Sequence, residues 1–147
     1  MATFTLRRSI AAPTELVFDV LADHRGYARL TPLRSSTLER EGDPAPNGVG
    51  AIRVLALAGP PIREEVTEYQ PPSRFAYKML SGAPVKSHTG TVDLSPAGSS
   101  TELVWTVDST PSLPIPGAAW AVMMRPVIMA LLRGVTRESE RRARAGG

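Results

Sequence analysis

The side chain best suited to acid–base chemistry in this chain is His88. An imidazole titrates near neutrality, as a general acid or base must. Alternation along its segment places His88 on the same face as Val92 and Leu94, so it points inward from a candidate strand. Two interpretations stay open: a ligand-binding or catalytic group, or a histidine near a strand start that is simply hydrogen-bonded or exposed. His24, in a short polar segment, is a weaker candidate.

Arg53 is the second candidate, because it also falls on the apolar face of its strand. A charge on such a face needs a partner. We expect the turn at residues 59–61 to place Leu57 opposite Ile62, a register that puts Glu64 diagonal to Arg53 on the same face. The predicted Arg53–Glu64 ion pair either stiffens the hairpin or lets the guanidinium bind a ligand carboxylate bidentately.

The inward faces of the remaining segments predict the walls of a small-molecule pocket. Such a pocket needs an apolar lining and a few polar groups that orient the ligand. The Tyr77 hydroxyl and the Trp105 indole N–H are further polar anchors, and Tyr77 joins His88 and Arg53 as a catalytic candidate. The predicted lining consists of Phe75, Tyr77, Met79, Leu103, Trp105, Trp120, Met123, Met124 and Val127.

Several other kinds of chemistry find no support in the sequence. Cysteine is absent, which excludes disulfides, a thiolate nucleophile and cysteine-based zinc sites. Two distant histidines form no metal-binding pattern, so we predict neither a metal nor a cofactor. The glycines at 48 and 50 join two candidate strands and do not open a helix, and there is no G-x-S-x-G elbow.

Seven candidate strands and a C-terminal helix must position these residues. The segment Thr3 to Ile10 alternates polar and apolar residues, as a half-buried strand does. Ala12 to Glu15 then opens a short helix, with Pro13 expected at its first helical position. A second short helix is expected from Asp23 to Leu30, before Pro32.

Short turns rich in proline and glycine divide the middle of the chain into an antiparallel meander. None of the turns is long enough to hold a crossover helix, which excludes parallel pairing. The six strands are expected at Ser35–Glu41, Ala51–Leu57, Ile62–Tyr69, Phe75–Leu80, Lys86–Leu94 and Thr101–Ser109.

The C-terminal part of the chain predicts one long helix. Apolar residues are dense from Trp120 to Leu132, and Pro126 is expected to kink the helix or mark its first turn. A transmembrane span is the alternative, but Arg125 and the prolines interrupt the apolar run that insertion requires. The stripe expected to pack on the sheet is Trp120, Met123, Met124, Val127, Ile128, Leu131 and Val135.

Composition is that of one folded domain. The 147 residues include 42% hydrophobic and 21% charged residues, and the net charge is +3. The arginine-rich end fits a solvated helix terminus and lacks the interleaved aromatic residues of a nucleic-acid site, so no nucleic-acid partner is expected. Without an apolar run, residues 1–10 do not look like a secretory signal, and a cytoplasmic location is expected.

Several local phrases resemble those of one superfamily. Residues 12–23, APTELVFDVLAD, resemble the "AP-x-E-x-V-F-x-x-L-x-D" opening of the polyketide cyclase/dehydrase and lipid-transport superfamily, which is also called START-like or SRPBCC. Residues 48–53, 63–66, 71–77 and 90–94 look like the bacterial polyketide cyclase-like branch, in the same order. The resemblance spans nearly the whole chain.

This resemblance implies an α+β helix-grip fold, in which a seven-stranded curved antiparallel sheet wraps around a long C-terminal helix. It also implies a cavity for a hydrophobic or amphipathic ligand, lipid or polyketide-like, while its motifs specify the fold better than the function. Three functions stay open: ligand binding without reaction; an aromatase/cyclase in which His88, Tyr77 or Arg53 assists enolisation or dehydration; and an interaction module or homodimer.

Overall fold

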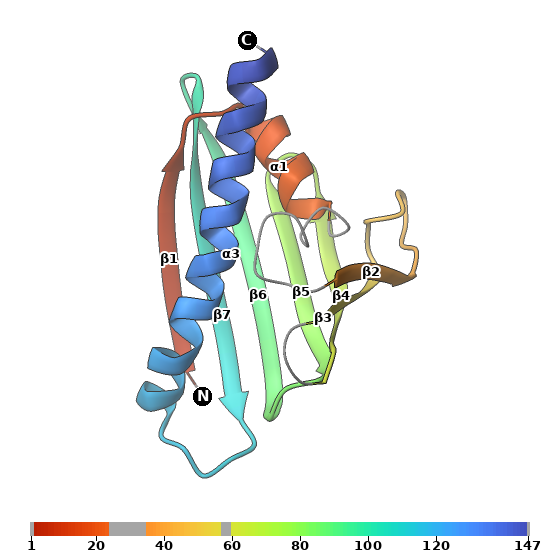
Figure 1. Ribbon diagram of the computed structural model, residues 1–147, viewed down its shortest axis with the longest axis vertical. Helices are drawn as coiled ribbons and strands as arrows, with labels where there is room; N and C mark the ends of the chain where they lie inside the picture. Colours follow the sequence, from red (N-terminus) through yellow and green to blue (C-terminus); the bar gives the residue numbers. More distant parts are fainter. Residues whose placement is uncertain (1, 24–34, 57–59, 147) are drawn as a thin grey trace.

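The structure, a computed structural model, is one seven-stranded antiparallel sheet with helices on its concave side (Figure 1). It describes residues 2–23, 35–56 and 60–146. The sheet order is β1-β7-β6-β5-β4-β3-β2, so the N-terminal strand pairs with the last one. The strands are β1 Ala2–Ile10, β2 Ser35–Arg40, β3 Ile52–Ala56, β4 Ile62–Gln70, β5 Arg74–Ser81, β6 Val85–Ala97 and β7 Ser100–Pro111. The helices are α1 Thr14–Ala22 and α3 Gly117–Gly146.

The predicted order is confirmed for the seven strands, the first short helix and the long C-terminal helix, and α1 begins one residue later than expected. Pro13 is the N-cap, with an extended backbone (φ −63°, ψ 151°), and is not the first helical residue. Its carbonyl oxygen accepts the backbone N–H groups of Leu16 and Val17, both at 3.1 Å. The helix therefore starts where the proline carbonyl can receive the first helical hydrogen bonds. The second short helix was expected at residues that, apart from Asp23, lie outside the described part of the chain.

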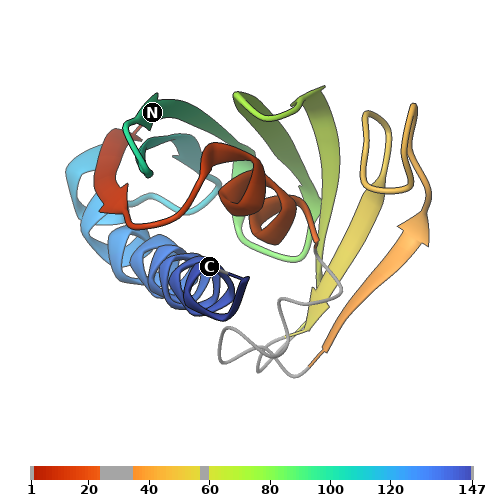
Figure 2. The same cartoon turned by 90° about the horizontal axis from the view of Figure 1, so that it is seen from above.

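The sheet curls so that its concave side faces α1 and α3 (Figure 2). Helix α3 packs against β1, β7 and α1, while β3 and β2 lie at the opposite edge of the sheet, away from α3. Apolar side chains from both helices and from strands β1 and β4 to β7 meet in one core. Its most deeply buried large residues include Leu6, Ile10, Val17, Phe18, Leu21, Phe75, Leu103, Trp105 and Leu132.

Helix α3 packs through most of the predicted stripe, since Trp120, Ile128 and Val135 are buried and Met124 and Leu131 are half-buried against the core. Met123 and Val127 are 56% and 44% exposed, so the prediction that these two pack on the sheet is wrong. The first half of the helix is apolar on almost every side, and the spacing there does not single out one face. Pro126 lies in the helix interior and not in its first turn.

By length and composition α3 also meets the criterion for a membrane-crossing helix, with a mean hydropathy of 1.4 in its most apolar stretch. The core helix of a soluble protein meets the same criterion, so this finding does not establish a membrane span. Its C-terminal end is anchored in the fold, because the backbone N–H of Ala11 donates to Glu140 Oε2 at 3.0 Å.

Gly90 makes room for a tyrosine ring on the concave face. It is the register partner of Tyr77 in the β5–β6 pair. A Cβ atom at position 90 would collide with the Tyr77 ring, at Cζ, Oη and Cε1. The glycine is therefore required by close approach of a side chain, and the position of the Tyr77 hydroxyl depends on it.

We predict that Gly90→Ala lowers the free energy of unfolding by about 1–3 kcal/mol, because the added methyl group must displace the Tyr77 ring from a packed core. Urea unfolding measures this loss. Gly146→Ala is the matched control, since a Cβ there meets no atom within 4 Å. Equal stability of the two variants would contradict the packing described here.

Candidate functional site

The candidate site is built around a buried ion pair between neighbouring strands. Arg53 on β3 lies directly opposite Glu64 on β4, and Arg53 Nε donates to Glu64 Oε1 at 3.0 Å. Their side chains are only 3% and 9% exposed. The predicted pair is confirmed, and together the two groups are electrically neutral, which is the condition under which charges are tolerated at this depth.

The predicted register of this hairpin was wrong by two residues. Leu55, and not Leu57, is the partner of Ile62, so Arg53 and Glu64 are opposed directly and not diagonally. Both residues before Ile62 are prolines, which have no N–H to donate to a ladder. Pairing therefore begins at Ile62, and the connection is longer than expected.

The Arg53 guanidinium also lies over two aromatic rings of β5. Its central carbon is 5.4 Å from the centroid of the Phe75 ring and 5.1 Å from that of Tyr77. Cations are attracted to the negative faces of such rings. The arginine is thus held by a carboxylate on the neighbouring strand β4 and by two aromatic rings on β5.

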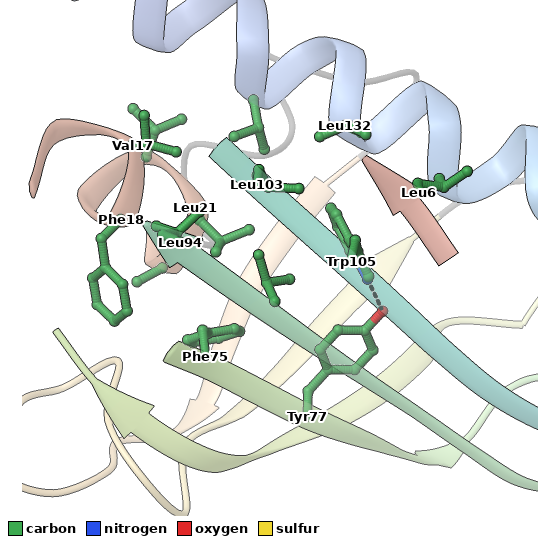
Figure 3. Close-up of a cluster of buried hydrophobic side chains, with 14 of the residues drawn as sticks. Leu6, Val17, Phe18, Leu21, Phe75, Tyr77, Leu94, Leu103, Trp105 and Leu132 are labelled. Carbon is green, nitrogen blue, oxygen red and sulfur yellow. Dashed lines mark hydrogen bonds between the residues drawn. The ribbon is translucent and has the colours of Figure 1, made fainter. Parts of the chain in front are cut away.

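Tyr77 continues the polar cluster toward β7 (Figure 3). Trp105 Nε1 donates to the Tyr77 hydroxyl at 3.3 Å, and the two rings meet edge to face with centroids 6.4 Å apart. Both side chains are almost fully buried, at 2% and 1% exposure. The two polar anchors predicted on β5 and β7 are therefore brought together, and they form a hydrogen bond with each other.

A second hydrogen-bonded chain links β6, β7 and the first turn of α3. His88 Nδ1 is 3.0 Å from Ser109 Oγ, and Trp120 Nε1 donates to the same oxygen at 2.8 Å. Sequence reasoning missed Ser109. The sequence did contain a signal, because Ser109 continues the inward alternation of Trp105 and Val107. A serine near the end of a strand, however, resembles a turn residue.

His88 is buried beside these groups, with its ring centroid 6.3 Å from that of Tyr77. Burial lowers the pKa of the imidazole below its ordinary value, and the negative charge of Glu64 opposes this effect less strongly. The imidazole is therefore neutral at pH 7, a state in which one ring nitrogen donates and the other accepts.

The other predicted site residues divide into buried, half-buried and exposed groups. Leu103 is buried in the core, and Met79 and Met124 are half-buried. Val127 is exposed, yet it lies within about 20° of Trp120 around the axis of α3, and Met123 within about 60°. Trp120 reaches Ser109 on β7, so this exposed apolar flank borders the point at which α3 is attached to the sheet.

The described part of the chain contains no group of three or more histidine, aspartate or glutamate residues that could hold a metal ion. What the cluster offers is a set of hydrogen-bonding groups and one neutral imidazole, with apolar and aromatic side chains around them. Such a set can orient a ligand, and the imidazole and phenol can in principle exchange protons with one.

The curved sheet, the long C-terminal helix and the polar cluster on the concave face define a helix-grip protein of the START-like class. The family model for polyketide cyclase / dehydrase and lipid transport matches residues 1–143. The chain therefore belongs to the polyketide cyclase/dehydrase and lipid-transport family, and this fold and family fit a ligand-binding protein.

Solved structures repeat the fold over almost the whole chain. A START superfamily protein from Mycobacterium smegmatis has a TM-score of 0.83 at 16% identity, covering 96% of this chain and 99% of that one. The Zhui aromatase/cyclase from Streptomyces sp. R1128 has a TM-score of 0.80 at 23% identity, covering 99% and 97%. The protein XoxI from Bacillus cereus has a TM-score of 0.75 at 16% identity, covering 95% and 96%. No curated protein matches the chain in sequence.

We predict that Arg53→Met lowers the free energy of unfolding by about 3–5 kcal/mol, because it leaves the buried Glu64 carboxylate without its cation. The double variant Arg53→Met/Glu64→Met should recover at least half of that loss. Urea unfolding of both variants tests this.

The surface pair Arg63–Glu39 supplies the control for this experiment. It also joins two strands of the sheet, β4 and β2, but its side chains are 38% and 42% exposed. Arg63→Met should therefore shift the unfolding midpoint little, since solvent screens an exposed pair. A loss for Arg53→Met no larger than that for Arg63→Met would contradict a buried pair.

We predict that His88 titrates below 6.5, the ordinary value for its pKa. Because the unfolded chain takes up this proton at a higher pH than the folded one, the stability that the neutral imidazole contributes is lost as the pH falls from about 6.5 toward the folded pKa. NMR titration in a His24→Gln background follows the one remaining imidazole. In urea unfolding between pH 7.5 and 5.5, the His88→Gln variant should lose less stability as the pH falls than the parent protein does. An unchanged pH dependence of stability would argue against a lowered pKa of His88.

Proposed function

We propose that the whole chain acts as a single domain that binds a hydrophobic or amphipathic small molecule, lipid or polyketide-like, between the concave face of the sheet and α3. The observation that carries this proposal is the exposed apolar flank of α3 beside Trp120, whose indole N–H reaches the sheet. Val127 there is 44% exposed although it is nearly in line with the buried Trp120. Apolar surface that the chain leaves uncovered where helix and sheet meet is surface that a hydrophobic ligand would cover.

The polar cluster opposite this flank supports the same proposal. Arg53, Glu64, Tyr77, His88 and Trp105 are all at least nine-tenths buried, and they come from five different strands. A few converging polar groups within an apolar surface orient a ligand without making the site hydrophilic. We propose that the protein acts in the cytoplasm, because a chain without cysteine forms no disulfide and the cytoplasm keeps thiols reduced.

A second candidate function is an aromatase/cyclase-type reaction on a polyketide-like substrate. The observation that favours it is the neutral His88 beside Tyr77, a pair of groups that can take and return protons during enolisation or dehydration. Similarity to the Zhui aromatase/cyclase is a similarity of fold, and it makes this chemistry worth testing.

Native mass spectrometry of the purified protein and a thermal-shift screen test the binding function. The screen uses palmitate, a phosphatidylglycerol and a hydroxyanthraquinone. A bound ligand at 100 times its Kd should stabilise the fold by about 2.7 kcal/mol. Absence of any co-purifying molecule together with no stabilisation by any of the three probes would remove the support for the proposal.

Two valine variants of α3 locate the binding surface. Val127→Arg should weaken binding at least about tenfold, because it places a charge on the apolar flank beside Trp120. Val122→Arg is the matched control, since Val122 is 73% exposed and lies about 160° round the helix from Trp120. Equal loss of binding in both variants would contradict a site under α3.

A further inference from the structure

The direction of the hydrogen bonds between α3 and His88 follows from the chemistry of the three groups. An indole N–H can only donate, so Ser109 Oγ must accept from Trp120 Nε1 across the 2.8 Å that separates them. Ser109 is completely buried, and its only other side-chain partner within the described residues is His88 Nδ1 at 3.0 Å. The hydroxyl hydrogen of Ser109 therefore has one available acceptor.

This arrangement selects one tautomer of the neutral imidazole. If Nδ1 carried the hydrogen, Ser109 Oγ would accept from both neighbours and its own hydrogen would be buried without an acceptor, which costs free energy. If Ser109 donates to Nδ1, every group in the chain is satisfied. The order is thus Trp120 to Ser109 to His88, and the imidazole hydrogen is on Nε2.

Nε2 lies on the side of the ring away from Ser109, and the hydrogen bonds of the described residues engage the ring at Nδ1. The residue as a whole is 2% exposed. The Tyr77 hydroxyl nearby accepts from Trp105. The donor that the chain of hydrogen bonds directs away from Ser109 is therefore His88 Nε2–H.

We propose that His88 Nε2–H is the donor that orients the ligand, and that the ligand carries an acceptor oxygen, in a ketone, ester or carboxyl group, at this point. This inference rests on the proposed function. It narrows the ligand class to oxygenated molecules and disfavours pure hydrocarbons and groups that only donate, such as ammonium. Ser109 is a positioning residue, because it acts through the imidazole.

The tautomer is tested without any ligand. In long-range ¹H–¹⁵N spectra of the His24→Gln protein at pH 7.5, Nδ1 should resonate as the unprotonated nitrogen and Nε2 as the protonated one. Ser109→Ala should weaken this preference, whereas Ser109→Thr, which keeps the hydroxyl, should retain it. A hydrogen on Nδ1 in the parent protein would overturn the inference, whatever the protein binds.

The ligand class is tested with two probes of similar shape, 2-acetylnaphthalene and 2-isopropylnaphthalene, in which a methyl group replaces the ketone oxygen. The ratio of their Kd values in the parent protein should favour the ketone by about 3- to 10-fold more than in His88→Phe, the range expected for one hydrogen bond. His88→Gln keeps an N–H donor and should keep much of the preference. Thermal melting of each variant checks that it is folded.

The outcomes separate the two proposals. If both naphthalenes bind and their ratio is the same in the parent protein and in His88→Phe, the binding function stands and the donor role of His88 is wrong. If neither these probes nor those of the thermal-shift screen bind the parent protein, the binding function fails and this ligand assignment fails with it.

Discussion

The concave face depends on a charge that has to be neutralised inside the sheet. Arg53 lies directly opposite Glu64 in the β3–β4 pair, so the ion pair stabilises this alignment of the two strands. The same guanidinium lies over the Tyr77 ring, which fits against Gly90 on the next strand, and the Tyr77 hydroxyl accepts a hydrogen bond from Trp105 on β7. One compensated charge thereby links strands from β3 to β7, because each group holds the next in place.

Helix α3 has two roles along its length. From Ile128 onward the helix packs on the core through Ile128, Leu132 and Val135, and Glu140 accepts from the connection between β1 and α1. Before Ile128 it is attached to the sheet through Trp120 and otherwise leaves much apolar surface exposed. Under the proposed function, core packing and ligand contact fall to different parts of one helix, and a substitution in one part need not disturb the other.

Most of the fold could be predicted, because side chains in a strand alternate with period two and proline and glycine mark the turns. Phe75, Tyr77, Leu103 and Trp105 follow that rule. Prediction failed where the local signal is ambiguous. The first half of α3 is apolar on nearly every side, so periodicity did not reveal that Met123 and Val127 are exposed. Ser109 gains its meaning only from two side chains brought beside it by folding. The ligand is not predictable from motifs that specify backbone and core.

The chain has two tryptophans, and the indole N–H groups of both are hydrogen-bonded inside the candidate site, one to Tyr77 and one to Ser109. Indole emission is sensitive to the polarity and hydrogen bonding of its surroundings. Almost all of the protein's near-ultraviolet fluorescence therefore originates within the polar cluster, with one source on the sheet and the other on the helix. Binding of a ligand at the candidate site can therefore be tested by tryptophan fluorescence in unlabelled protein.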